Sequence, residues 1–291
     1  MSSNCKKTST SAKLMAAMLA SFTFLLPPGC GTWIGNPNDE KKPDTTTNAN
    51  VTVVSMQFQG TDPLLNLTTA TSVTVKGNTA EGSGALSLTE AYVVLDEIVL
   101  KKKEGQAKNS FKGPIILDLI SNSVSPDLQP IELEAGAYND VKIKIAKLES
   151  EKFKGKIPNP NIEKNSIFLS GTFTSSSGLT RPFKLVLPLN EEFSLSTSRS
   201  KETATEVSGT TSQVIMAFRL NKWFDFTNSK LNEKKLDFSS ISESTIDINE
   251  KSAETAKKLG ETIKEMVKYS ARFGKDKDGD GKLDKTEDDD N

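Results

Sequence analysis

Six residues near the C-terminus have the types and spacing of a calcium-binding loop. Ca²⁺ binds about six to eight oxygen atoms, and a glycine at the sixth position of the loop allows the sharp turn that brings the first carboxylates together. Gly281 stands at that position of a twelve-residue segment. The backbone carbonyl of Lys282 and both carboxylate oxygens of Glu287 would complete the shell. The spacing predicts one calcium site with the ligands Asp276, Asp278, Asp280, Lys282, Asp284 and Glu287.

Two other interpretations of this segment fit the sequence less well. A loop that started at Asp278 would put Lys282 where a carboxylate is required. An acidic tail that merely solvates the C-terminus would not reproduce Asp-x-Asp-x-Asp-Gly with Leu283 and Glu287 in phase. A specific site is therefore favoured, and Leu283, at position 8, is expected to turn inward.

This segment resembles the loops of EF-hand proteins, which implies calcium as the cofactor. It departs from them because only Asp288–Asn291 follow, so the chain has no exiting helix, and because there is no second loop. Lys275 stands where the entering helix usually presents an aromatic residue. These departures favour a structural clip, a calcium site that stabilises the fold, over a calcium sensor. A dockerin-like partner-docking module remains an alternative, although dockerins carry two such loops.

The N-terminus has the three zones of a bacterial export signal. Basic residues precede an apolar run, Leu14–Leu26, which is followed by Pro27-Pro28-Gly29-Cys30. The run is too short for a membrane-spanning helix, which needs about twenty residues. The end of the signal is similar to a bacterial lipobox, with proline at two positions where the lipobox has leucine and a small residue. The resemblance implies cleavage after residues 1–29 and lipidation of Cys30.

The residues after Cys30 indicate where the protein works. Residues 30–50 are expected to be the lipidated cysteine and a disordered polar spacer that holds the rest of the chain away from the membrane. Gly31 is not the Asp that retains lipoproteins at the inner membrane of enteric bacteria. The expected location is the bacterial cell envelope, lipid-anchored and on the outer membrane.

The composition argues against several classes of function. The chain has no histidine, which removes Ser-His and Cys-His nucleophile pairs and His-containing zinc sites. The adjacent carboxylates Asp96-Glu97 and Glu191-Glu192 would point to opposite faces of a strand. The net charge is −1, and the basic cluster Lys101-Lys102-Lys103 has no interleaved aromatic residues, so nucleic acid is not an expected partner. We therefore predict a protein that is not an enzyme, with a calcium-dependent carbohydrate-active enzyme as the alternative.

Residues 51–248 have the sequence pattern of a mainly β domain. Short runs with a period of two, such as Val141–Ile145, alternate with Gly-containing turns, and no long helical period interrupts them. The pattern predicts an antiparallel β-sandwich, either one large domain or two, 51–148 and 149–248. Residues 235–238 are expected to form a strand, and Ser194–Gln213 the longest loop. One amphipathic helix is expected over 249–274, followed by the calcium loop and acidic tail, 275–291.

Several segments resemble a domain of unknown function that is common in bacterial envelope lipoproteins. They include Ala91–Lys103, Pro114–Ile120 and the turn Leu133-Glu134-Ala135-Gly136-Ala137-Tyr138, which leads into an alternating strand. The resemblance covers roughly residues 51–225. It implies a β-sandwich of immunoglobulin- or transthyretin-like type and no chemistry. The ligand of such a sandwich would be a protein or a carbohydrate.

Overall fold

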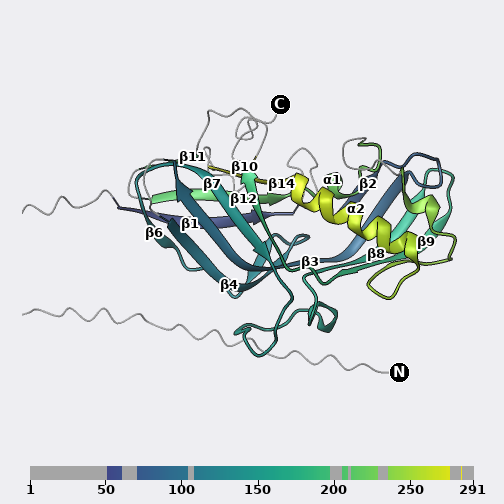
Figure 1. The fold of residues 1–291 in the computed structure, drawn as a ribbon, viewed down its shortest axis with the longest axis horizontal. Helices are drawn as coiled ribbons and strands as arrows, with labels where there is room; N and C mark the ends of the chain where they lie inside the picture. The colour runs from purple at the N-terminus through teal and green to yellow at the C-terminus, as the bar shows by residue number, and fades with distance from the viewer. Residues whose placement is uncertain are drawn as a thin grey trace, which may run out of the picture. The chain divides into compact units, whose positions relative to one another are not determined.

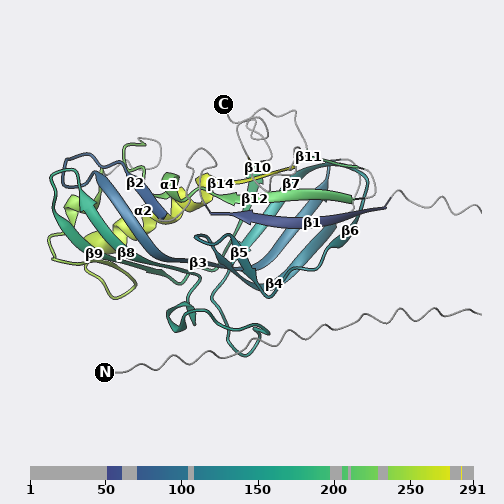
Figure 2. The same cartoon turned by 180° about the vertical axis from the view of Figure 1, so that it is seen from behind.

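The computed structural model describes residues 51–60, 71–103, 108–196, 205–208, 211–228, 235–275 and 283. All of them belong to one compact unit, Thr47–Asn291, which is mainly β (Figures 1 and 2). The strands are β1 (Val51–Gln59), β2 (Thr71–Val75), β3 (Gly84–Lys102), β4 (Lys108–Asp118), β5 (Ser123–Ser125), β6 (Ile131–Glu134), β7 (Gly136–Ile145), β8 (Ile167–Ser175), β9 (Thr180–Leu187), β10 (Glu191–Ser196), β11 (Thr205–Val207), β12 (Thr211–Phe218), β13 (Ile246–Ile248) and β14 (Ala271–Lys275). The helices are α1 (Leu220–Trp223) and α2 (Glu254–Ser270), with 3₁₀ turns η1 (Pro160–Ile162) and η2 (Phe238–Ser240).

The strands form two sheets. One has the order β14-β12-β1-β6, and the other has the order β10-β7-β3-β8-β9-β13, with β2 and β4 also on β3, β5 on β4 and β11 on β7. Most pairs are antiparallel, as expected, but β1–β12 and β9–β13 are parallel, so both sheets are mixed. The expected β-rich class is confirmed.

The alternative of two domains, 51–148 and 149–248, is wrong. The parallel pair joins Val53 of β1 to Thr211 of β12, and β3 pairs with β8 along most of its N-terminal half. Both pairings connect the two proposed halves of the chain. Because a sheet shared across the boundary cannot be divided without exposing backbone hydrogen-bonding groups, residues 47–291 behave as one unit.

Strand β3 is the central strand of the ten-stranded sheet, with the most pairing partners. Its 19 residues pair in turn with β2, β8, β4 and β7 (Figure 1). One extra residue enters β3 at Thr89 relative to β8, and another enters at Asp96 relative to β7. Such bulges bend a strand and increase its twist. At each shift two residues that are not buried, Thr89-Glu90 and Asp96-Glu97, stand between buried stretches of the strand.

One hydrophobic core lies between the two sheets and under α2. Valine, leucine and isoleucine from both sheets contribute to it, together with Trp223, which is fully buried. Its aromatic centre surrounds Phe238, whose ring lies 4.9 to 5.9 Å from those of Phe173, Phe183, Phe224 and Phe226, mostly in edge or tilted geometry. Rings at these distances prefer such angles.

A second, smaller core covers the other face of the ten-stranded sheet. The segment between β7 and β8 carries Leu148, Phe153 and Ile162, which pack over Val94 and Phe168. This explains why β3 is buried on both faces near Val93, Val94 and Leu95. A strand covered on both sides is apolar without alternation, as this part of the sequence is.

The helix predicted over 249–274 is shorter than expected. Helix α2 ends at Ser270, and Ala271–Lys275 form β14, which pairs with β12. The apolar residues Ala271 and Phe273 fit a period of two as well as a helical stripe, and both are buried. The strand is favoured because it supplies hydrogen-bond partners to the backbone of β12, which would otherwise be a sheet edge.

Two further expectations about local structure were wrong. The segment expected to be a strand at 235–238 contains instead Asp237, which caps η2 by accepting a hydrogen bond from the backbone N–H of Ser239 at 2.9 Å. The same buried carboxylate accepts from the N–H of Asn78 at 2.6 Å. The region expected to be one long loop, 194–213, contains the end of β10, all of β11 and the start of β12.

Candidate functional site

The predicted site residues lie outside the described part of the chain. This holds for Cys30 and for the calcium ligands Asp276, Asp278, Asp280, Lys282, Asp284 and Glu287. Within the described ranges, no group of three or more Cys, Asp or Glu side chains comes together in a way that could hold a metal ion. What the structure describes is two attachment points of the segment 276–287, for which the sequence predicts a calcium loop (hereafter the calcium segment): β14 before it and Leu283 within it.

Both attachment points lie on the same strand, β12. At the end of β14, Lys275 is the partner of Val214 and Gly274 is the partner of Ile215. Leu283 is 1 % exposed and packs against Ile215 and Ala217. The chain therefore leaves the edge of β12 at residue 275 and is again in contact with β12 at residue 283.

The alternation of β12 explains why Leu283 docks there. Val214 and Met216 belong to the main core, while Ile215 and Ala217 point to the opposite face of the sheet. On that face the neighbouring strand β1 presents Gln57 beside Ile215. The partner of Ile215 on the other side is Gly274, which has no side chain to cover it. Leu283 thus buries apolar surface that its neighbours leave open, as expected of the apolar residue at position 8.

The element that enters the calcium segment is a strand. An EF-hand enters its loop from a helix, and the sequence predicted that α2 would continue to residue 274. Instead, α2 ends at Ser270 and β14 intervenes. The resemblance is therefore limited to the loop itself.

The adjacent carboxylates Asp96 and Glu97 are each paired with a lysine. Asp96 accepts from Lys144 at 2.6 Å, and Glu97 pairs with Lys112. These lysines come from β7 and β4, the two strands that flank β3. The hydrogen bond from Lys112 lowers the pKa of the Glu97 carboxyl below its usual value. Each carboxylate thus pairs with a lysine of a different neighbouring strand.

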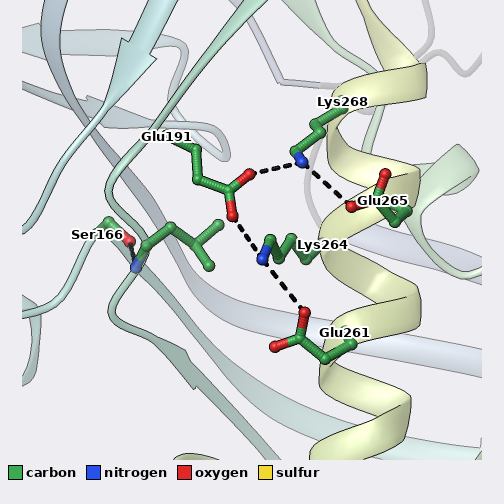
Figure 3. A network of polar contacts seen from close by, with 7 residues as sticks. Ser166, Glu191, Glu261, Lys264, Glu265 and Lys268 are labelled. Carbon is green, nitrogen blue, oxygen red and sulfur yellow. Dashed lines mark hydrogen bonds and ion pairs between the residues drawn. The ribbon is translucent and has the colours of Figure 1, made fainter.

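Glu191 is the centre of a larger charge network (Figure 3). Its two carboxylate oxygens pair with Lys264 and with Lys268, the latter at 2.5 Å. The lysines also contact Glu261 and Glu265 on the same helix, at 3.2 and 3.1 Å. Burial opposes the charged form of Glu191, but the hydrogen bonds and attraction of the two lysines outweigh it, so the pKa of its carboxyl is lowered. The network fastens α2 to the start of β10.

A cavity of about 450 Å³ adjoins this network. Leu187, Ile248 and Gly260 contribute apolar lining, and Lys257 and Glu261 contribute charge. The helix approaches the sheet closely here, because a Cβ on Gly260 would lie 3.1 Å from the side chain of Ile248. Sequence reasoning missed the Glu191 network. Its only local signal is the pair of lysines four residues apart on α2, which identifies a charged face but not its partner.

No helix in the described ranges is both long and apolar enough to cross a membrane. Compared with known proteins, the chain matches no protein family, no curated protein and no solved structure.

Proposed function

We propose that this protein is an exported lipoprotein, anchored in the bacterial envelope through Cys30, whose β-sandwich is a non-catalytic binding or structural domain clipped at its C-terminus by one calcium ion. The calcium ligands would be Asp276, Asp278, Asp280, Lys282, Asp284 and Glu287. The ligand of the sandwich would be a protein or a carbohydrate. The N-terminal signal and the loop motif are the sequence features on which the proposal rests.

The observation that supports the calcium site best is the burial of Leu283 against Ile215 and Ala217. Position 8 of a calcium loop carries an apolar residue that turns inward, and Leu283 does so while flanked by charged and polar residues. An acidic tail that only solvates the C-terminus has no reason to bury one side chain in phase with the motif. Residues 275 and 283 are both attached to β12. The chain between them, which carries the first ligands, is therefore held at both ends, and this lowers the entropy cost of forming the calcium loop.

The domain type is supported by the packing of both sheets on one core. Two sheets face to face are the architecture of a sandwich. The buried Tyr138 at the turn between β6 and β7 is compatible with an immunoglobulin- or transthyretin-like type, since sandwiches of the immunoglobulin kind use a tyrosine at a corner. The parallel pairs β1–β12 and β9–β13 depart from the antiparallel pairing of that type.

Calorimetric titration of calcium into the mature protein tests the site. A calcium loop of this kind should bind with a Kd of roughly 0.1 to 1 mM, the range of extracellular calcium modules. Glu287→Ala removes the bidentate ligand and Asp276→Ala removes the first, so each should abolish most of the affinity. Asp289→Ala, outside the coordination frame, is the matched control. Equal losses from all three variants would mean a diffuse polyanion, and the calcium site would be withdrawn.

The anchor is tested separately. Cys30→Ala should prevent acylation and move the protein from the detergent phase to the aqueous phase on phase separation. Protease treatment of intact cells would then distinguish a surface-exposed domain from a periplasmic one. If the Cys30→Ala protein still partitions with detergent, the membrane attachment is elsewhere in the chain.

A further inference from the structure

The cavity beside the Glu191 network lies where two parallel strands end. Strand β13 pairs in parallel with β9, and Ile248 at the end of β13 is the partner of Leu185. The carboxyl ends of the two strands therefore meet, and from there the chain continues in two ways, since β9 leads to β10 and β13 leads to α2. In open sheets with parallel neighbours, ligands bind in crevices at such ends. The cavity of about 450 Å³ occupies this position.

The floor of the cavity is apolar. Leu187 and Ile248, the last residues of the two strands, are buried, and Pro188 and Leu189 after β9 are half-buried. Gly260 of α2 lines the same side and has no side chain to fill the space. A Cβ at this position would lie 3.1 Å from Ile248 and 3.5 Å from Leu187, so the helix and the strands are already close. The floor thus presents apolar surface of a fixed shape, which suits an apolar group of a ligand.

Charged residues of both signs surround this floor. Those that line the cavity are Glu191, Glu250, Lys257, Glu261 and Lys264. Lys264 pairs with both Glu191 and Glu261, so these three are engaged with one another (Figure 3). The exposed side chains of Lys257 and Glu250 make no ion pair or hydrogen bond with any residue that the structure describes. One cation and one anion at the rim are therefore available to a ligand.

We propose that this cavity binds a short peptide with apolar side chains and free ends. The proposal rests on the proposed function, in which the sandwich is a binding domain, and it gives the chemical class of the ligand. Lys257 pairs with the carboxylate of the peptide and Glu250 with its ammonium group, while an apolar side chain packs on the floor. A neutral sugar would leave both rim charges without an ionic partner, and a simple anion or cation would match only one of them. The volume lies within the range of about 300 to 1,000 Å³ for pockets that hold drug-sized ligands, a size class that includes a dipeptide.

Calorimetric titration of the dipeptide Leu-Leu into the full chain carrying Cys30→Ala, at low ionic strength, tests the site. The Kd should lie in the range of about 0.1 to 1 mM, as expected for a ligand of this size. N-acetyl-Leu-Leu-amide has the same side chains without the charged ends, and it should bind at least about tenfold more weakly. Gly-Gly keeps the charged ends and lacks the apolar side chains, so it should also bind more weakly.

Two neighbouring lysines of α2 provide matched variants. Lys257→Gln removes the cation that lines the cavity and should weaken the binding of Leu-Leu about fivefold. Lys258→Gln removes the same charge from the next residue, which does not line the cavity and pairs with Glu254, so it should change the affinity less than about twofold. Asn190→Trp fills the rim from an exposed position and should abolish binding, and a thermal melt of this variant checks that the fold is kept.

The neutral disaccharide cellobiose, titrated in parallel, distinguishes the two classes of ligand. Binding of Leu-Leu that is weakened by capping its ends and by Lys257→Gln, but not by Lys258→Gln, supports the proposal. Binding of cellobiose in place of Leu-Leu, lost in Asn190→Trp, would keep the sandwich as a binding domain and overturn the peptide as its ligand. The proposal is also overturned if Leu-Leu does not bind, if the free and capped peptides bind equally, or if the two lysine variants weaken binding equally. None of these results depends on the lipid anchor or on calcium.

Discussion

The hydroxyl of Tyr138 donates a hydrogen bond of 2.9 Å to the backbone carbonyl of Glu134, four residues earlier. This bond spans the corner at which the chain passes from β6 in the four-stranded sheet to β7 in the ten-stranded sheet. Gly136 between them has a φ of +145°, which side chains rarely adopt, and Tyr138 itself is fully buried. The Leu133–Tyr138 motif noted in the sequence is thus a turn that connects the two sheets.

Removal of this hydroxyl should destabilise the fold. In Tyr138→Phe the ring still fills the core, but the Glu134 carbonyl loses its partner, which should lower the free energy of unfolding by about 1–2 kcal/mol. Urea denaturation measures the change. Tyr92→Phe is the control, because Tyr92 is half-buried and its ring stacks on Phe168, so its loss of a hydroxyl should stay within about 0.5 kcal/mol. Equal effects would show that the corner bond contributes nothing specific.

The Glu191 network should make stability depend on pH. The folded pKa of Glu191 lies below its ordinary value of 4.5, so its contribution is present above that pH and is lost as pH falls through the folded pKa. Glu191→Gln should therefore be less stable than the wild type by about 1–2 kcal/mol at pH 7. This gap in the free energy of unfolding between wild type and Glu191→Gln should disappear at acidic pH. Urea denaturation at a series of pH values measures it.

Glu192→Gln is the matched control for that series. Glu192 pairs with one lysine, Lys142, at 2.7 Å, and its side chain is 52 % exposed, whereas Glu191 has two lysines and is 28 % exposed. Water screens the more exposed pair, so Glu192→Gln should change stability much less. An unchanged gap between wild type and Glu191→Gln from pH 7 down to acid would contradict an ionic contribution from Glu191.

Leu283 should link the calcium segment to β12. Leu283→Ala opens a space over Ile215 and Ala217 and should lower the free energy of unfolding by about 2 kcal/mol. If the segment binds calcium as proposed, the same variant should also raise the calcium Kd. Leu179→Ala, at a leucine that is 51 % exposed, should do neither. Thermal melts with and without calcium give both quantities, and an unchanged Kd would mean that docking and metal binding are independent.

Arg181 should act as a buried tether rather than as a surface charge. It is 6 % exposed and donates to the carbonyls of Phe238 at 2.8 Å and Ile241 at 2.7 Å. Burial lowers the pKa of its guanidinium from the ordinary value. Arg181→Met leaves two buried carbonyls without these donors and should cost about 2–3 kcal/mol. Hydrogen exchange should speed up first in residues 238–248, and uniform exchange across the chain would argue against a local tether.

Local patterns in the sequence were sufficient for the class of fold and for many of its strands. The alternation of Val141–Ile145 lies within an observed strand, β7. The period of side chains along a strand is set by the backbone over a few residues, so it can be recognised without knowing the partner. The calcium motif is equally local, because all of its ligands lie within twelve residues of sequence.

Only the tertiary structure decided which distant segments meet. Ala271–Lys275 suits a helix and a strand alike, and the choice depends on β12, more than fifty residues earlier. The pairing of Glu191 with Lys264 depends on the same kind of long-range contact. The sequence by itself determined the β-rich class of the fold, because side-chain alternation is encoded in neighbouring residues. The expected export signal and calcium loop are likewise read from neighbouring residues alone, and they remain predictions. The mixed sheets and the charge network around Glu191 were decided by packing, because burial and backbone pairing depend on the whole chain.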